Sequence, residues 1–75
     1  MNFAQLHSNE PLTRDEMVSI TALVEYLAFT KGNHTENTYC HLAAEFKVTD
    51  VKELKRRDYD RAIKFLVDLN DLPIN

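Results

Sequence analysis

The clearest helix signals in the chain lie in residues 11–32, which read PLTRDEMVSITALVEYLAFTKG. Thr13 is a suitable N-cap, and Glu16 three residues later completes a capping box, in which each side chain accepts a hydrogen bond from the other residue's backbone N–H. Gly32 can adopt the left-handed backbone conformation in which many helices end. Together these signals predict a helix over residues 14–31.

Two apolar stripes follow the helical spacing of this segment. The broad stripe is the expected core face and comprises Met17, Ile20, Leu23, Val24, Leu27 and Ala28. The second stripe comprises Val18, Ala22 and Phe29, and it would be wasted on a helix that packs on one side only. We therefore expect either that the helix is sandwiched between two others or that the second stripe contributes to an oligomer interface.

The rest of the chain continues in helical patterns. We predict a second helix over residues 36–47 capped by Thr35, a single turn capped by Asp50, and a last helix over residues 56–69. Their inward apolar positions are Tyr39, Leu42, Ala43, Phe46, Val51, Leu54, Tyr59, Ala62, Ile63, Leu66 and Leu69. One glycine and two prolines leave few tight turns, and no strand-like alternation competes with the helices. The sequence therefore predicts an all-α, compact three-helix domain with an additional short helical turn before the last helix.

The length of 75 residues allows one domain at most, near the size at which a single core is marginal. We divide the chain into an N-terminal arm (1–11), a helical domain (12–70) and a C-terminal tail (71–75). The apolar side chains of the arm and of the second stripe exceed what three short helices need, so we expect a homodimer or a partner-bound form. The predicted association surface comprises Phe3, Leu6, Val18, Ala22 and Phe29.

The composition is typical of a soluble globular domain, with 44% hydrophobic and 28% charged residues. Cys40 is the single cysteine, so no internal disulfide can form, and a reduced, intracellular setting is the simpler interpretation. The N-terminal residues lack the basic and apolar regions of a signal peptide, and no stretch approaches the roughly 18 consecutive apolar residues of a membrane span. We expect a cytoplasmic protein that makes no membrane contact.

No group of residues points to catalysis or to a metal site. Cys40 and His41 are neighbours on a helix, which sets their side chains about 100° apart and outside hydrogen-bond reach. A structural zinc site takes about four ligands at recognisable spacing, and His34, Cys40 and His41 have no CxxC or HxxxH companion. Gly32 is the one glycine, so there is no glycine-rich phosphate loop. We expect no enzyme activity, no catalytic residue, no metal and no cofactor.

The charges are distributed unevenly along the chain. Between Lys47 and Lys64, seven basic and four acidic residues give +3, whereas two basic and eight acidic residues elsewhere give −6. The candidate contact residues surround the junction of the single turn and the last helix, and they are Lys52, Lys55, Arg56 and Arg57. Three interpretations are open for them: a solvated helix start, a contact surface for an acidic peptide or protein, and a nucleic-acid contact.

A protein partner with an acidic segment is favoured over nucleic acid. Nucleic-acid-binding domains are normally strongly basic and often present aromatic side chains for stacking. This chain has a pI of about 5.5, and acidic residues are interleaved with the bases. The aromatic residues of the basic segment, Tyr59 and Phe65, fall at or near the expected buried face.

Residues 37–66, NTYCHLAAEFKVTDVKELKRRDYDRAIKFL, resemble the small helical domain at the C-terminus of phage antirepressor and related prophage regulatory proteins. The shared pattern is carried by Tyr39, Leu42, Phe46, Val48, Leu54, Tyr59, Ala62, Ile63 and Leu66. With ITALV in the first helix, the likeness covers roughly residues 12–69. It implies a non-enzymatic phage or prophage regulatory module that acts by binding another protein, in the cytoplasm of a bacterial host cell.

A second and looser likeness spans the same region. PLTRDEMVSITALV (11–24) and ELKRRDYDRAIKFL (53–66) are similar to the C-terminal helical domain of the lambda-type Red beta annealing protein. That domain docks a partner exonuclease and the acidic tail of the host single-strand-binding protein. This likeness implies a recombination-protein docking domain for a nuclease or a single-strand-binding protein tail. A nucleic-acid-binding regulator is the other alternative.

Overall fold

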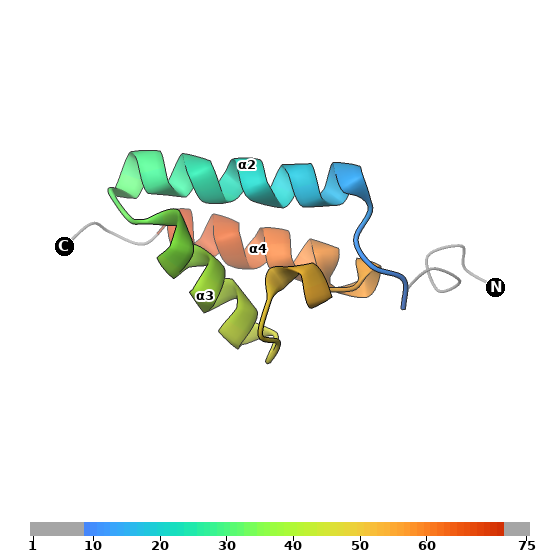
Figure 1. The fold of residues 1–75 in the computed structure, drawn as a ribbon. Helices are drawn as coiled ribbons and strands as arrows, with labels where there is room; N and C mark the ends of the chain where they lie inside the picture. The colour runs from blue at the N-terminus through green and yellow to red at the C-terminus, as the bar shows by residue number, and fades with distance from the viewer. Residues whose placement is uncertain (1–8, 72–75) are drawn as a thin grey trace.

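The computed structural model describes residues 9–71, which contain three α-helices. These are α2 (Arg14–Lys31), α3 (Thr35–Glu45) and α4 (Tyr59–Asn70), with two short 3₁₀ turns, η1 (Val51–Glu53) and η2 (Arg56–Asp58), between α3 and α4. In Figure 1, α2 and α4 lie along each other and run in the same direction, while α3 crosses them at an angle. The described range contains no strand. The predicted all-α, three-helix class with an extra turn before the last helix is confirmed.

Both ends of α2 follow the local sequence signals. The Thr13 N–H donates to Glu16 Oε1 at 2.8 Å, and the Glu16 N–H donates to Thr13 Oγ1 at 3.1 Å, which completes the predicted capping box. Gly32 has a φ of 71°, and its N–H donates to the Ala28 carbonyl at 3.0 Å. The predicted helix over residues 14–31 is confirmed at both ends.

The start of α3 differs from the prediction by one residue. Thr35, the predicted cap, is the first helical residue, and His34 occupies the N-cap position without a side-chain hydrogen bond. The His34 carbonyl accepts from the Asn37 N–H at 3.1 Å and from the Thr38 N–H at 3.4 Å, so the first turn of α3 closes on His34 and includes Thr35.

The end of α3 comes two residues earlier than predicted, at Glu45, because the chain turns left-handed at Lys47 with a φ of 57°. The Val48 N–H donates to the Ala43 carbonyl at 3.0 Å, and the Lys47 N–H donates to the Ala44 carbonyl at 3.1 Å. These two bonds form a Schellman motif, whose left-handed position is usually held by glycine. A lysine at that position carries no sequence signal for a helix end.

The two 3₁₀ turns are each closed by an aspartate. Asp50 Oδ1 accepts from the Lys52 N–H at 2.8 Å, and Glu53 Oε2 accepts from the Asp50 N–H at 2.9 Å, so η1 is the predicted single turn with Asp50 as its cap. η2 replaces the predicted first turn of the last helix. Asp58 Oδ2 accepts from the Lys55 N–H at 3.0 Å, and the Asp58 N–H donates to the Lys55 carbonyl at 2.8 Å. These bonds tighten the backbone before α4 begins.

The core lies where α2 packs against α4 and α3. Its buried residues are Ile20, Val24, Leu27, Leu42, Leu54, Ala62 and Leu66. All of them stand at inward positions predicted from the helical spacing. Leu54 lies between η1 and η2 and is fully buried, so it anchors both turns to the helices.

Leu66→Ala should lower the free energy of unfolding by about 2–5 kcal/mol, because truncating a buried leucine leaves a cavity. Leu66 is 0% exposed, and its neighbour Val67 is 43% exposed. Val67→Ala is therefore the matched control, with an expected change well below that of Leu66→Ala. The midpoint of urea unfolding measures both effects. Equal midpoints for the two variants would contradict the assignment of the core face of α4.

Lys47→Gly should raise the free energy of unfolding by about 0.5–1 kcal/mol. The left-handed conformation costs a non-glycine residue about 1–2 kcal/mol, and the larger entropy of glycine in the unfolded chain offsets part of the gain. Lys47→Ala is the control because it removes the same side chain but keeps Cβ. Thermal unfolding of the two variants gives the comparison, and a glycine variant less stable than the alanine variant would exclude a left-handed Lys47.

Candidate protein-binding surface

Of the four predicted basic residues, Arg56 forms an ion pair within the chain, and the other three line the surface. Arg56 turns back toward α2, where its Nε is shielded from solvent and lies 3.3 Å from Glu16 Oε1. The same Glu16 oxygen accepts the hydrogen bond from the Thr13 N–H. The Arg56 charge is therefore engaged within the chain, where it ties η2 to the start of α2.

The residues that precede α2 are hydrogen-bonded to η2. Arg57 Nη1 donates to Asn9 Oδ1. The Arg56 backbone N–H donates to the Glu10 carbonyl at 2.9 Å. Asn9 and Glu10, which the sequence places in the N-terminal arm, are thus hydrogen-bonded to η2.

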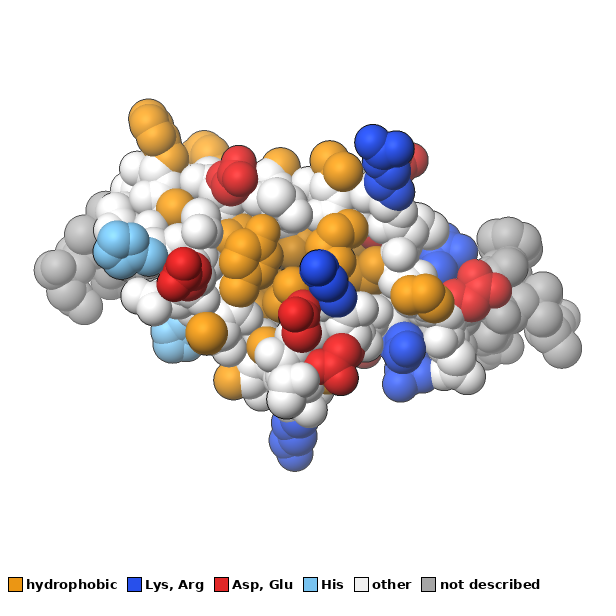
Figure 2. Space-filling view, viewed as in Figure 1, with side chains coloured by type: hydrophobic (Ala, Val, Ile, Leu, Met, Phe, Trp, Pro, Cys, Tyr) orange, Lys and Arg blue, Asp and Glu red, His pale blue; other side chains and the backbone are white. Residues whose placement is uncertain are grey.

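The three outward residues, Lys52, Lys55 and Arg57, line one surface hollow of about 730 Å³. We call it the basic hollow, because its charged lining consists of Lys47, Lys52, Lys55, Arg57 and Arg61 together with Glu45, Glu53 and Asp58. In Figure 2, many of the Lys and Arg side chains lie toward the end of the molecule where α2 begins. Lys47 and Arg61 were not predicted as site residues. Their membership in the positively charged segment is the one sequence signal that could have indicated them.

The carboxylate of Glu53 is occupied by donors of its own turn. Glu53 Oε2 accepts from the Thr49 hydroxyl at 2.6 Å, from the Thr49 N–H at 3.0 Å and from the Asp50 N–H at 2.9 Å. The hydrogen bond from the Thr49 side chain is the main cause that lowers the pKa of Glu53, followed by the backbone donors, with a smaller contribution from the Lys55 charge. This side chain therefore stabilises η1 as an ionised acceptor.

The other two carboxylates of the hollow are also engaged within the chain. Asp58 Oδ2 closes η2, and Glu45 Oε2 lies 3.6 Å from Arg61 Nη2. By contrast, no ion pair within the described range involves the hollow's three lysines, Lys47, Lys52 and Lys55. The carboxylates that line the basic hollow are therefore engaged within the chain, whereas its three lysines form no ion pair among the described residues.

The aromatic residue of the hollow is covered by a cation. The Arg61 guanidinium carbon lies 4.4 Å from the centroid of the Phe46 ring, which is a cation–π geometry. Tyr59 and Phe65, as predicted, are partly buried and packed against the core. Phe46 is therefore the one described aromatic residue that lines the hollow, and a guanidinium already lies over its ring.

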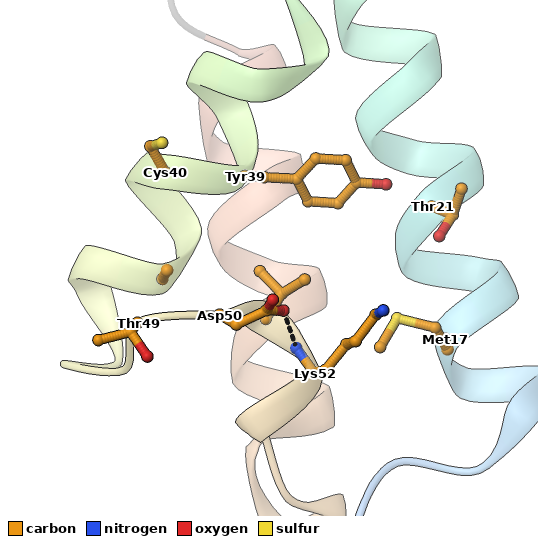
Figure 3. A pocket seen from close by; sticks show the side chains of 9 residues that line it. Met17, Thr21, Tyr39, Cys40, Thr49, Asp50 and Lys52 are labelled. Carbon is orange, nitrogen blue, oxygen red and sulfur yellow. Dashed lines mark hydrogen bonds between the residues drawn. The ribbon is translucent and has the colours of Figure 1, made fainter.

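A second depression, the apolar groove, lies between α2, α3 and η1 and has a volume of about 410 Å³. It is lined by Met17, Thr21, Tyr39, Cys40, Ala43, Thr49, Asp50, Val51 and Lys52. Figure 3 shows the Tyr39 ring pointing from α3 toward α2, and Lys52 extending from η1 toward Met17. Hydrophobic side chains gather in the middle of this face (Figure 2). Lys52 lines both the apolar groove and the basic hollow.

The second apolar stripe of α2 remains on the surface. Val18 is 58% exposed, Phe29 is 89% exposed, and Ala22 is exposed as well. Packing of α2 against both α3 and α4 therefore does not account for the stripe, which none of the described elements covers. Phe3 and Leu6, the other residues of the predicted association surface, lie outside the described residues.

The described part of the chain contains no cluster of three or more His, Cys, Asp or Glu side chains that could hold a metal ion. No helix within residues 9–71 is long and apolar enough to cross a membrane. Comparisons with protein-family models, with curated proteins and with solved structures gave no match. The charges and shapes of the two depressions are therefore the main basis for a functional proposal.

Thr49→Val should raise the pKa of Glu53 toward its ordinary value of 4.5, because it removes the main cause of the lowering. A carboxyl whose pKa is lower in the folded state stabilises the fold above its unfolded pKa, and that stabilisation is lost as the pH falls through the folded pKa. The stability of the variant should therefore depend less on pH below about 4.5 than that of the wild type.

Carbon-13 NMR titration of the Glu53 carboxyl, together with urea unfolding at several pH values, measures both effects. Thr30→Val is the control, because the Thr30 hydroxyl donates to the Tyr26 carbonyl and not to a carboxylate. A Glu53 pKa that is the same in wild type and Thr49→Val would contradict the assigned hydrogen bond.

Proposed function

We propose that this chain is a non-enzymatic protein-interaction module whose basic hollow binds an acidic segment of another protein. The observation that carries the proposal is the state of the charges around the hollow. Glu45, Glu53 and Asp58 are engaged by groups of the chain itself, whereas Lys47, Lys52 and Lys55 form no ion pair within the described residues. An acidic segment would supply the carboxylates that these lysines lack.

The overall charge of −3 does not prevent such binding. At physiological salt the Debye length is about 8 Å, so a ligand in the hollow responds mainly to the charges that line it. The acidic remainder of the surface would repel an acidic partner that approaches elsewhere. Complementary charge of this kind contributes to the association rate and to the choice of partner more than to affinity.

A nucleic-acid contact fits the hollow less well. Tight binding to duplex DNA requires that many phosphates be neutralised, and the five basic side chains of the hollow, among three carboxylates, can neutralise only a few. The arginine over Phe46 also occupies one face of the one aromatic ring that lines the hollow. Nucleic acid is therefore the alternative that the experiment below tests.

The proposed setting is a phage or prophage regulatory protein in the cytoplasm of a bacterial host cell. The support for this setting is the likeness of residues 37–66 to the C-terminal domains of phage antirepressor and prophage regulatory proteins. The looser likeness to the Red beta docking domain supports an acidic protein tail as the kind of ligand.

Reversing two charges of the hollow, with Lys52→Glu and Lys55→Glu together, should weaken the binding of a labelled poly-glutamate peptide by about tenfold or more at moderate salt. Each lost charge contact at an exposed site contributes up to about 1 kcal/mol, and repulsion adds to the loss. Fluorescence anisotropy measures the binding, and far-ultraviolet circular dichroism should show unchanged helix.

Lys64→Glu is the control for charge reversal outside the hollow, because Lys64 is an exposed lysine of α4 that pairs with Asp68 and does not line the hollow. Poly-glutamate binding that is equal in the double variant and in Lys64→Glu would sink the proposal. Tight retention of duplex DNA at physiological salt, lost in the double variant, would replace it with the nucleic-acid alternative.

A further inference from the structure

Binding of an acidic segment in the basic hollow does not use the apolar lining of the groove or the charges at the end of the groove away from Lys52. We infer that the groove binds an amphipathic α-helix of the partner protein, with the acidic end of that helix beside Lys52 and its basic end beside Glu25 and Glu36. The inference rests on the proposed function, since Lys52 belongs to both depressions. It adds to that proposal that the partner binds through an amphipathic α-helix.

The size and lining of the groove suit apolar side chains of a ligand. Its volume of about 410 Å³ lies within the range of roughly 300–1,000 Å³ that is typical of ligand sites. Met17, Tyr39 and Val51 are only half-buried there, so each keeps apolar surface that a ligand can cover. The polar lining residues at the η1 end are Thr49, Asp50 and Lys52. The Thr49 hydroxyl donates to Glu53 and the Asp50 carboxylate caps the turn, so the Lys52 ammonium is the polar group there with no ion pair among the described residues.

The walls of the groove favour a helical ligand over an extended one. An extended peptide needs a strand edge with which to pair its backbone N–H and C=O groups. The side walls are two α-helices, which use these groups in their own hydrogen bonds, and the described chain contains no strand. A helix satisfies its own backbone and needs only an apolar face, as in the helix-in-groove mode of recognition.

Charges of opposite sign mark the two ends of the groove. Glu25 stands one turn beyond Thr21 on α2, and Glu36 stands one turn before Cys40 on α3. Because α2 ends and α3 begins at the same short loop, both glutamates lie toward the loop end of the groove, and both are exposed. Lys52 lies at the other end, near Met17 (Figure 3). This layout complements a helix that is acidic at one end and basic at the other.

The apolar surface of the groove also continues over α2. A neighbouring hollow of about 420 Å³ shares Met17 and Thr21 with the groove and reaches Val18 and Ala22. A ligand helix that fills the groove and leans on α2 would therefore cover part of the second apolar stripe, which no described element covers.

The test uses the full chain and two synthetic amphipathic helices with the same leucine face. One helix carries glutamates at one end and lysines at the other, and the second carries lysines at both ends. The wild type should bind the first helix about tenfold more tightly, a difference of about 1.4 kcal/mol. Lys52→Glu should reverse this preference, because it replaces the cation that faces the acidic end.

Cys40→Arg should weaken the binding of both helices by at least about tenfold, because a large side chain at an exposed lining position fills the groove without entering the core. His41→Arg is the matched control, since His41 is the exposed neighbour of Cys40 on α3 and does not line the groove. Equal affinities in Cys40→Arg and His41→Arg would overturn the inference. So would a wild-type homodimer in sedimentation equilibrium that Cys40→Arg dissociates, because a second copy would then occupy the groove.

Lys55→Glu separates this inference from the proposed function, because Lys55 lines the basic hollow but not the groove. It should weaken poly-glutamate binding and leave helix binding unchanged. If Lys55→Glu weakens poly-glutamate binding but Cys40→Arg leaves the affinity for the helices unchanged, the inference fails and the proposed function stands. If helix binding depends on Cys40 and poly-glutamate does not bind, the acidic-segment proposal fails and the groove stands.

Discussion

A single carboxylate, that of Glu16, connects the start of α2 to the turns that carry the basic hollow. Its Oε1 accepts a hydrogen bond from the Thr13 N–H at 2.8 Å and lies 3.3 Å from Arg56 Nε. The two side chains are 17% and 31% exposed, so water and salt screen this pair less than a fully exposed one. Together with the hydrogen bond from the Arg56 N–H to the Glu10 carbonyl and the fully buried Leu54, this contact holds η2 beside the start of α2, at the edge of the hollow.

A chain with a net charge of −3 presents a basic surface here because five basic and three acidic side chains line the hollow. The acidic side chains near η1 and η2 cap turns or pair with arginines, as Glu53 does through three hydrogen bonds to Thr49 and Asp50. Carboxylates used in this way stay at fixed positions within the turns. The lysines around them have no such partner within residues 9–71, and their charge is available to a ligand.

Lys52 lies between the two depressions and lines both of them. Its backbone N–H is held by Asp50, which fixes the start of its side chain, and fully buried Leu54 anchors the turn from the other side. From this position the side chain lines both the apolar groove and the basic hollow, and its ammonium end points toward Met17 in the groove (Figure 3). A ligand that combines an apolar helical face with neighbouring carboxylates would use both depressions at once, and a ligand that has one of these features would use one.

Local sequence alone determined α2, because its start at Thr13 and its end at Gly32 depend on hydrogen bonds between residues at most four positions apart. It also determined the core face of each helix, through the spacing of apolar residues. The sequence did not predict that α3 ends at Glu45, because the left-handed residue of the terminating turn is Lys47, and a left-handed lysine has no signature in the sequence. Tertiary structure decided that the Arg56 charge is not free, since its pairing with Glu16 joins residues that are 40 positions apart in the sequence. Hydrogen bonds between neighbours are encoded along the chain, but the availability of a charge depends on which side chains the folded core brings within reach.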